Sequence, residues 1–236
     1  MLDTLIATWR RPDILLVAVG ALASTLLWRV PLLGLLFYPF RLLNTFVHEV
    51  SHGLAALLTG GSFERFVVYA NMEGLALIRG GSRVIVASAG YLGTALFGGL
   101  LILLTATPLA EQTLLLALGA SLGLLCLMFV RNLFGWLAGM LLAASLGASG
   151  WLLSDQHAAL LVALLALQMP LAAIHSLVDL LRLAVRRARP GRVSDAHLLA
   201  RHTGIPAIIW ASLWFISALA ILFVTVGLAY AQVPLW

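Results

Sequence analysis

The chain is a succession of long apolar runs separated by short segments rich in Gly, Pro or Arg. A hydrocarbon core about 30 Å thick requires about 20 apolar residues per helical span. Seven spans are predicted, and the second is long enough to hold two segments. They lie near 13–28, 31–59, 84–105, 113–130, 133–153, 158–181 and 206–230. The predicted fold class is therefore an all-α polytopic membrane protein, a single integral-membrane domain over residues 1–236.

Composition supports a membrane protein and excludes a soluble globular domain. Hydrophobic residues make up 62% of the chain and charged residues only 10%, and the mean hydropathy is +1.07. The net charge of +5 comes from arginine, because the chain has no lysine. These arginines gather in short connections and do not alternate with aromatic residues along one face, so nucleic acid is not an expected partner. The expected partner is the lipid bilayer.

Arginine placement predicts the topology. If the seven spans alternate, most arginines fall on one side, with Arg29 as the exception. They are Arg10, Arg11, Arg65, Arg79, Arg83, Arg131 and those of the stretch 182–201. By the positive-inside rule that side is cytoplasmic, which places the N-terminus inside and makes 182–205 a cytoplasmic Arg-rich loop. The first span is expected to stay uncleaved. An arginine-only, Ala- and Leu-rich composition points to a bacterial plasma membrane.

One segment, 60–82, interrupts the helical pattern. Two short runs flank Asn71-Met72-Glu73-Gly74: 63–69, rich in β-branched and aromatic residues, and the apolar run 75–78. This pattern predicts two strands joined by a turn. Because lipid does not tolerate unpaired strand edges, the β-hairpin must lie at the interface or be covered by protein.

The strongest chemical motif is His48-Glu49-Val50-Ser51-His52. On a helix a spacing of four places both imidazoles on one face, where they can share a zinc ion, and Glu49 lies beside them as the catalytic base. The flanking residues are apolar, and ionisable groups in such a helix are costly unless paired, hydrated or bound to metal. The motif therefore predicts a Zn²⁺ site within a membrane helix.

Hydrolytic zinc takes three protein ligands, so one more is needed. Among the nine carboxylates, only Glu49 and Asp179 fall inside helical runs, and Asp179 is the predicted third ligand. His175 precedes it by four residues and is a candidate second-shell partner or substitute ligand. The alternative is that Asp179 pairs with Arg182 at the helix end. Asp195, after a Pro-Gly breaker, is expected to cap a helix.

These motifs resemble the site-2 protease family of intramembrane zinc metalloproteases, and in particular its short branch without a soluble regulatory domain. The resemblance rests on the His48–Gly53 motif, the hairpin that follows, the small-residue segment 88–93 and the late aspartate at 177–179. It implies a protease core over 31–181, with His48, His52 and Asp179 on zinc and Glu49 as base. It also implies that the hairpin holds an unwound substrate as an added strand.

Asn132 has two interpretations, a polar partner in the active site or a helix cap. Beside the predicted protease, whose partner is a transmembrane protein substrate, two other functions stay open. One is a membrane metal or ion transporter with His48, His52, His175 and Asp179 as a relay, although the other half of the chain holds no matching His-rich helix. The other is a catalytically idle scaffold, which would have no chemical need for Glu49.

Overall fold

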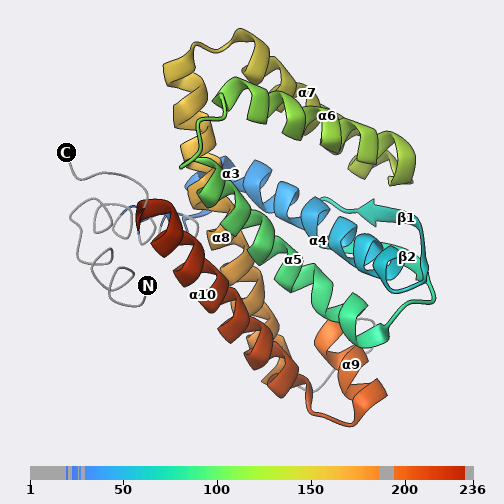
Figure 1. Ribbon diagram of the computed structural model, residues 1–236. Coiled ribbons are helices and arrows are strands. Elements are labelled where there is room, and N and C mark those ends of the chain that lie inside the picture. The colour runs from blue at the N-terminus through green and yellow to red at the C-terminus, as the bar shows by residue number, and fades with distance from the viewer. Residues whose placement is uncertain (1–19, 21–22, 26, 28–29, 186–193, 232–236) are drawn as a thin grey trace.

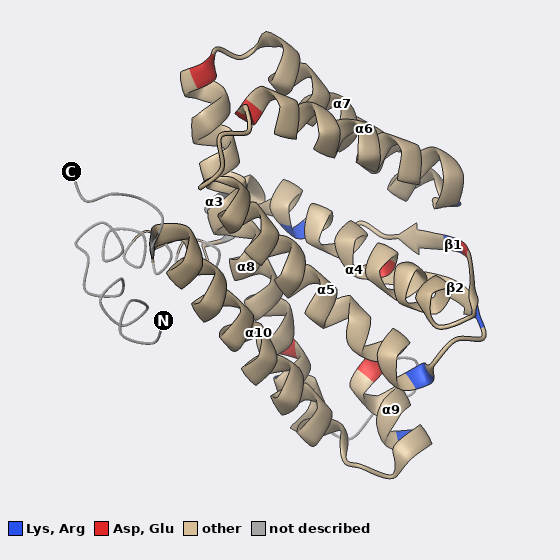
Figure 2. Ribbon diagram, viewed as in Figure 1, with Lys and Arg blue, Asp and Glu red and all other residues tan. Residues whose placement is uncertain are grey.

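The computed structural model describes residues 20, 23–25, 27, 30–185 and 194–231. It is mainly helical with one small sheet (Figure 1). Five helices are long and apolar enough to cross a membrane. They are α5 (Arg83–Leu104), α6 (Glu111–Phe129), α7 (Leu133–Leu152), α8 (Asp155–Val185) and α10 (Ala207–Ala231). The protein is therefore an integral membrane protein, and Figure 2 shows how few charges its helices carry.

The five helices match the last five predicted spans, but the count of seven is not confirmed. The first predicted span, 13–28, lies mostly outside the described residues. The second divides at Phe37 into α3 (Pro31–Leu36) and α4 (Tyr38–Leu58). The 21 residues of α4 give it a length of about 31 Å, yet its polar residues keep it out of the set of five.

Helix α4 lies at the centre of the molecule. Helices α6 and α7 form an antiparallel pair on one side of it, while α5, α8 and α10 pack together on the other (Figure 1). Contacts with α5, α7, α8 and both strands shield the polar residues of α4. Outward-facing apolar side chains on α6, α7 and α10 present a surface suited to lipid. They include Leu124, Leu127, Leu137, Leu141, Ile216 and Phe223.

The predicted hairpin is confirmed. Strands β1 (Ser62–Val68) and β2 (Gly74–Arg79) pair antiparallel, with Phe66 opposite Ala76 and Val68 opposite Gly74. The outer edge of β1 is covered by the connection between α6 and α7. The backbone N–H of Arg131 donates to the carbonyl of Phe66 at 3.1 Å. This meets the requirement that the edge be shielded.

The segment predicted as an Arg-rich loop contains a helix, α9 (Asp195–Thr203). It ends at Gly204, whose φ of 76° is the left-handed conformation of a helix C-cap. Its buried residues Ala196 and Leu199 join an apolar cluster with α8 and α10. Packing therefore holds this short helix in place, although an isolated helix of this length would be marginal in water.

Candidate metal centre and active site

The helix α4 presents His48 and His52 on one face, as the spacing predicts. Their Nε2 atoms lie 3.0 Å apart, and the two rings meet edge to face. Glu49 lies next to them and is only 5% exposed. These three residues therefore occupy the arrangement expected of a zinc-binding helix with its base.

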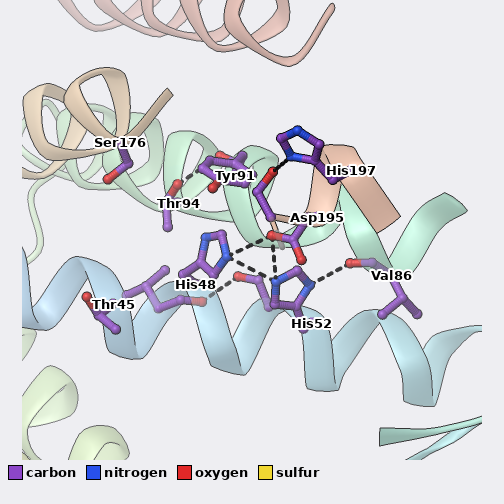
Figure 3. A network of polar contacts seen from close by, with 12 residues as sticks. Thr45, His48, His52, Val86, Tyr91, Thr94, Ser176, Asp195 and His197 are labelled. Carbon is purple, nitrogen blue, oxygen red and sulfur yellow. Dashed lines mark hydrogen bonds and ion pairs between the residues drawn. The ribbon is translucent and has the colours of Figure 1, made fainter. Parts of the chain in front are cut away.

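The carboxylate that joins the two histidines is Asp195, the first residue of α9 (Figure 3). Its Oδ2 lies 3.3 Å from the Nε2 of His48 and 3.5 Å from the Nε2 of His52. Within the part of the chain that the structure describes, these three form the one group of side chains close enough together to hold a metal ion.

The donor set fits zinc in chemistry and in size. Two imidazoles and a carboxylate are a known catalytic ligand set, and metal–ligand distances of about 2.0 to 2.1 Å in a tetrahedron place neighbouring ligand atoms about 3.3 Å apart. The observed separations of 3.0, 3.3 and 3.5 Å bracket that value. The Nδ1 of His52 lies 2.6 Å from the Val86 carbonyl. Donation from Nδ1 to that oxygen leaves the Nε2 lone pair for a metal.

Gly90 on α5 leaves the space that this site needs. A Cβ at this position would collide with the Nε2 atoms of both His48 and His52. The absence of a side chain therefore lets α5 pass directly over the ligand atoms. The backbone at Gly90 forms one wall of the cradle.

An aromatic stack supports the His48 ring. Tyr91 meets it edge to face, with ring centroids 4.6 Å apart, and stacks in turn on Trp214 of α10 at 5.4 Å. The indole N–H of Trp214 donates to the hydroxyl of Ser88 at 3.0 Å. This chain of contacts fixes the orientation of His48 from the α10 side.

The electrostatics of Asp195 suit a metal ligand. Burial alone raises the pKa of its carboxyl, but the hydrogen bonds and charges of His48 and His52 lower it by more. The net direction is a pKa well below the usual range for aspartate. Asp195 is therefore an anion, the form that can donate electrons to a cation.

The structure corrects the expectation for the third ligand. Asp179 is 68% exposed and pairs with Arg182 at 2.9 Å, which is the alternative that the sequence left open. It is not brought to the two histidines. His175 is not part of the group around the two histidines either, and its Nδ1 lies 2.8 Å from the Leu171 carbonyl of its own helix.

Two further expectations change. Asn132 holds the N-cap position of α7 without a capping hydrogen bond from its side chain. Its amide instead donates to the Val68 carbonyl at 2.7 Å and accepts from the Val68 N–H at 3.1 Å. For α9 the N-cap position belongs to Ser194, and Asp195 follows it in the first turn.

The sequence held a weak signal for Asp195. An acidic residue directly after Ser194 marks the start of a helix, and among the helices that the structure describes, α9 is a short polar one between long apolar ones. Nothing in the spacing links position 195 to position 52, because the chain folds back to bring them together. A search restricted to carboxylates within apolar runs therefore could not reach it.

A cavity of about 970 Å³ opens over the site. Residues of α4, β2, α5 and α9 line it, among them His48, Glu49, His52 and Asp195. The base also touches the hairpin: the Ala76 N–H donates to the Glu49 carboxylate, and a Cβ on Gly74 would collide with that carboxylate. The site therefore combines metal donors, a base and a strand edge around one cavity.

Comparisons with known proteins agree with this geometry. The family model described as "Peptidase M50B-like" matches residues 16–225. No curated protein and no solved structure matches. The matched region includes the histidine motif, the hairpin, the helices α5 to α9 and most of α10. The chain belongs to the Peptidase M50B-like family, which is the site-2 protease family.

Proposed function

We propose that this protein is an intramembrane zinc metalloprotease that hydrolyses peptide bonds within or near transmembrane segments of other membrane proteins. The observation that carries the proposal is the convergence of His48, His52 and Asp195 beside a buried Glu49, at the wall of a cavity. Family membership supports a membrane metalloprotease. Arginine placement supports a cytoplasmic N-terminus, and the arginine-only, Ala- and Leu-rich composition supports a bacterial plasma membrane.

The hairpin offers one free edge to a substrate, and it is the edge of β2. The carbonyl of Phe66 binds Arg131, and the N–H and carbonyl of Val68 bind Asn132. The backbone N–H and C=O groups of Phe66 and Val68 therefore point away from β2. In an antiparallel ladder the residues opposite them, Ala76 and Gly74, must then point away from β1. That direction faces Glu49 and the cavity.

A substrate strand added to β2 would therefore lie beside the base. A peptide bond in an intact helix has its N–H and C=O groups paired, so cleavage requires local unwinding. The edge at Gly74, Ala76 and Ile78 can pair with the backbone groups that unwinding frees. Strand addition thus lowers the cost of exposing the scissile bond.

The residues divide the chemistry. His48, His52 and Asp195 would hold the ion, and a bound zinc ion would polarise water and offset the negative charge that develops on the scissile carbonyl. Glu49 accepts a proton from the attacking water and passes it to the leaving nitrogen. The Ala76 N–H orients the Glu49 carboxylate until the substrate strand arrives.

The test is zinc content and cleavage measured on the same purified protein. Wild type is expected to hold about one zinc per chain and to cut model transmembrane peptides. Glu49→Gln keeps the shape of the side chain and the three metal donors but removes the base, so it should retain zinc and lose cleavage. A zinc-loaded wild type that cuts no peptide, or a Glu49→Gln variant that cuts at the normal rate, would contradict the proposal.

A further inference from the structure

The cavity over the site has a basic rim that the proposed chemistry does not use. Arg83 at the start of α5, with Arg201 and His202 near the end of α9, line it and are exposed. Figure 2 shows basic positions at the start of α5 and on α9 at the same end of the molecule. This group of three residues is called the basic rim below.

The basic rim has no acidic partner within the described part of the chain. The guanidinium of Arg83 lies 3.3 Å from the Nδ1 of His202, so its hydrogen-bonding neighbour is an imidazole and not a carboxylate. The ion pairs between arginine and carboxylate among the described residues are those of Arg79 with Glu64 and of Arg182 with Asp179, and they include neither Arg83 nor Arg201. Among the described residues, no carboxylate therefore pairs with the guanidinium group of Arg83 or of Arg201, both of which line the cavity.

The basic rim lies beyond one end of the free β2 edge. Strand β2 runs from Gly74, beside Glu49, to Arg79, and Gly80 and Gly81 then lead to Arg83. At about 3.3 Å per residue, a strand paired with β2 would pass from the base to the rim in roughly three to six residues. At the other end of β2 the cavity is lined by Glu73. The binding cleft is therefore electrically polarised along its length.

We propose that the basic rim selects substrates that carry an acidic residue just outside the cleaved segment. This residue lies in the part of the substrate chain that passes out of the cavity beside Arg83 and Arg201. The inference rests on the proposed function and deepens it by naming a substrate class. Arginine pairs with carboxylates through two parallel hydrogen bonds, so an aspartate or glutamate at this distance has a matched partner.

The basic rim also disfavours substrates with a basic flank, which is the commonest kind of flank on a transmembrane segment. Cytoplasmic ends of transmembrane segments carry an excess of Lys and Arg. Such an end would bring like charges together at the mouth of the cavity, which is unfavourable. The basic rim therefore discriminates between substrates by repelling basic flanks as well as by attracting acidic ones. Membrane proteins with basic flanking residues should therefore bind weakly and escape cleavage.

The test measures peptide binding, which does not require turnover. Labelled model peptides with one Ala/Leu-rich span and a short polar tail are titrated into the Glu49→Gln variant. The tail carries Asp, Asn or Lys, at the N-terminal end in one series and at the C-terminal end in the other. In one of the two series, Asp should bind roughly tenfold tighter than Lys, with Asn between them. The preference should weaken as salt is raised.

Charge reversal supplies the decisive comparison. Adding Arg83→Glu and Arg201→Glu should invert the order, so that the Lys peptide binds best. The matched control is Arg65→Glu, an exposed arginine of β1 that does not line the cavity, and it should keep the original order. Equal affinities for all three tails in both series would overturn the inference, and so would an equal loss for all peptides on charge reversal, which would indicate binding of anionic lipid instead.

These outcomes are separate from those that test the protease itself. Cleavage by wild type without any preference for tail charge would remove the basic rim from substrate selection and leave the protease intact. A charge preference in binding without any cleavage by the zinc-loaded wild type would contradict the protease and leave the role of the basic rim in peptide binding intact.

Discussion

Two aspartates near the C-terminal part of the chain have opposite surroundings. Asp195 lies within ion-pair distance of two imidazoles, whereas Asp179 is exposed beside Arg182. We predict that Asp195→Asn lowers zinc content to a small fraction of one ion per chain, because an amide is a much poorer donor than a carboxylate. Asp179→Asn, the matched control, should keep its zinc. Elemental analysis of both variants decides the matter, and zinc loss from Asp179→Asn alone would reverse the assignment.

Gly90 is a second residue whose replacement has a sharp expected outcome. In Gly90→Ala the added methyl group would occupy the space next to both Nε2 atoms, so zinc content and activity should fall together. In Gly147→Ala, the control, the new Cβ meets nothing within 4 Å, and a helical Gly-to-Ala change stabilises by up to about 1 kcal/mol. Normal zinc in Gly90→Ala, measured beside a thermal unfolding curve, would show that α5 can move away from the site.

At the scale of elements, the free edge of β2 can be tested with proline. Ala76→Pro removes an N–H that points away from β1, so the hairpin should persist, while pairing with Glu49 and with a substrate strand is lost. The expected effect is a fall in kcat/KM of roughly tenfold for each lost hydrogen bond, with zinc retained. Leu77→Pro, whose N–H faces β1, should instead destabilise the hairpin. Unchanged cleavage by Ala76→Pro would exclude strand addition at this edge.

Elements with a regular pattern were predictable, and those fixed by tertiary contacts were not. The last five apolar runs and the turn around Asn71-Met72-Glu73-Gly74 follow from local composition. The division at Phe37 and the central place of α4 depend on what packs around that helix. Helix α9 is stabilised by its contacts with α8 and α10, which no local pattern within 182–205 reveals.

The same division holds for the site. His48, Glu49 and His52 could be named because one helical turn joins them. The choice of Asp179 assumed that a metal ligand must come from a membrane-spanning run, whereas the structure brings Asp195, and not Asp179, to the two histidines. The contact that decides between them spans about 140 residues of sequence.

For the whole molecule, the metal should couple the central helix to the C-terminal part of the fold. Removing zinc leaves α9, nine residues long, held by apolar packing and by the two histidines. Hydrogen exchange in α9 should therefore accelerate after chelation, while exchange in the α6 and α7 pair stays unchanged. A ligand at 1,000 times its Kd stabilises the folded state by about 4 kcal/mol, so unfolding should also occur at a lower temperature. Uniform exchange rates with and without chelator would contradict this coupling.

The placement of the third donor on α9 also sets the timing of activity during biosynthesis. The motif residues leave the ribosome early, but Asp195 follows His52 by about 140 residues. At about 5 to 20 residues per second, that interval lasts roughly 7 to 30 seconds. During it the nascent chain already carries the base and two imidazoles beside other newly inserted helices, yet lacks a complete centre. On the proposed function, the newly made protein is thus inactive, and it becomes able to cut only after the helices from α4 to α8 and the start of α9 have been made.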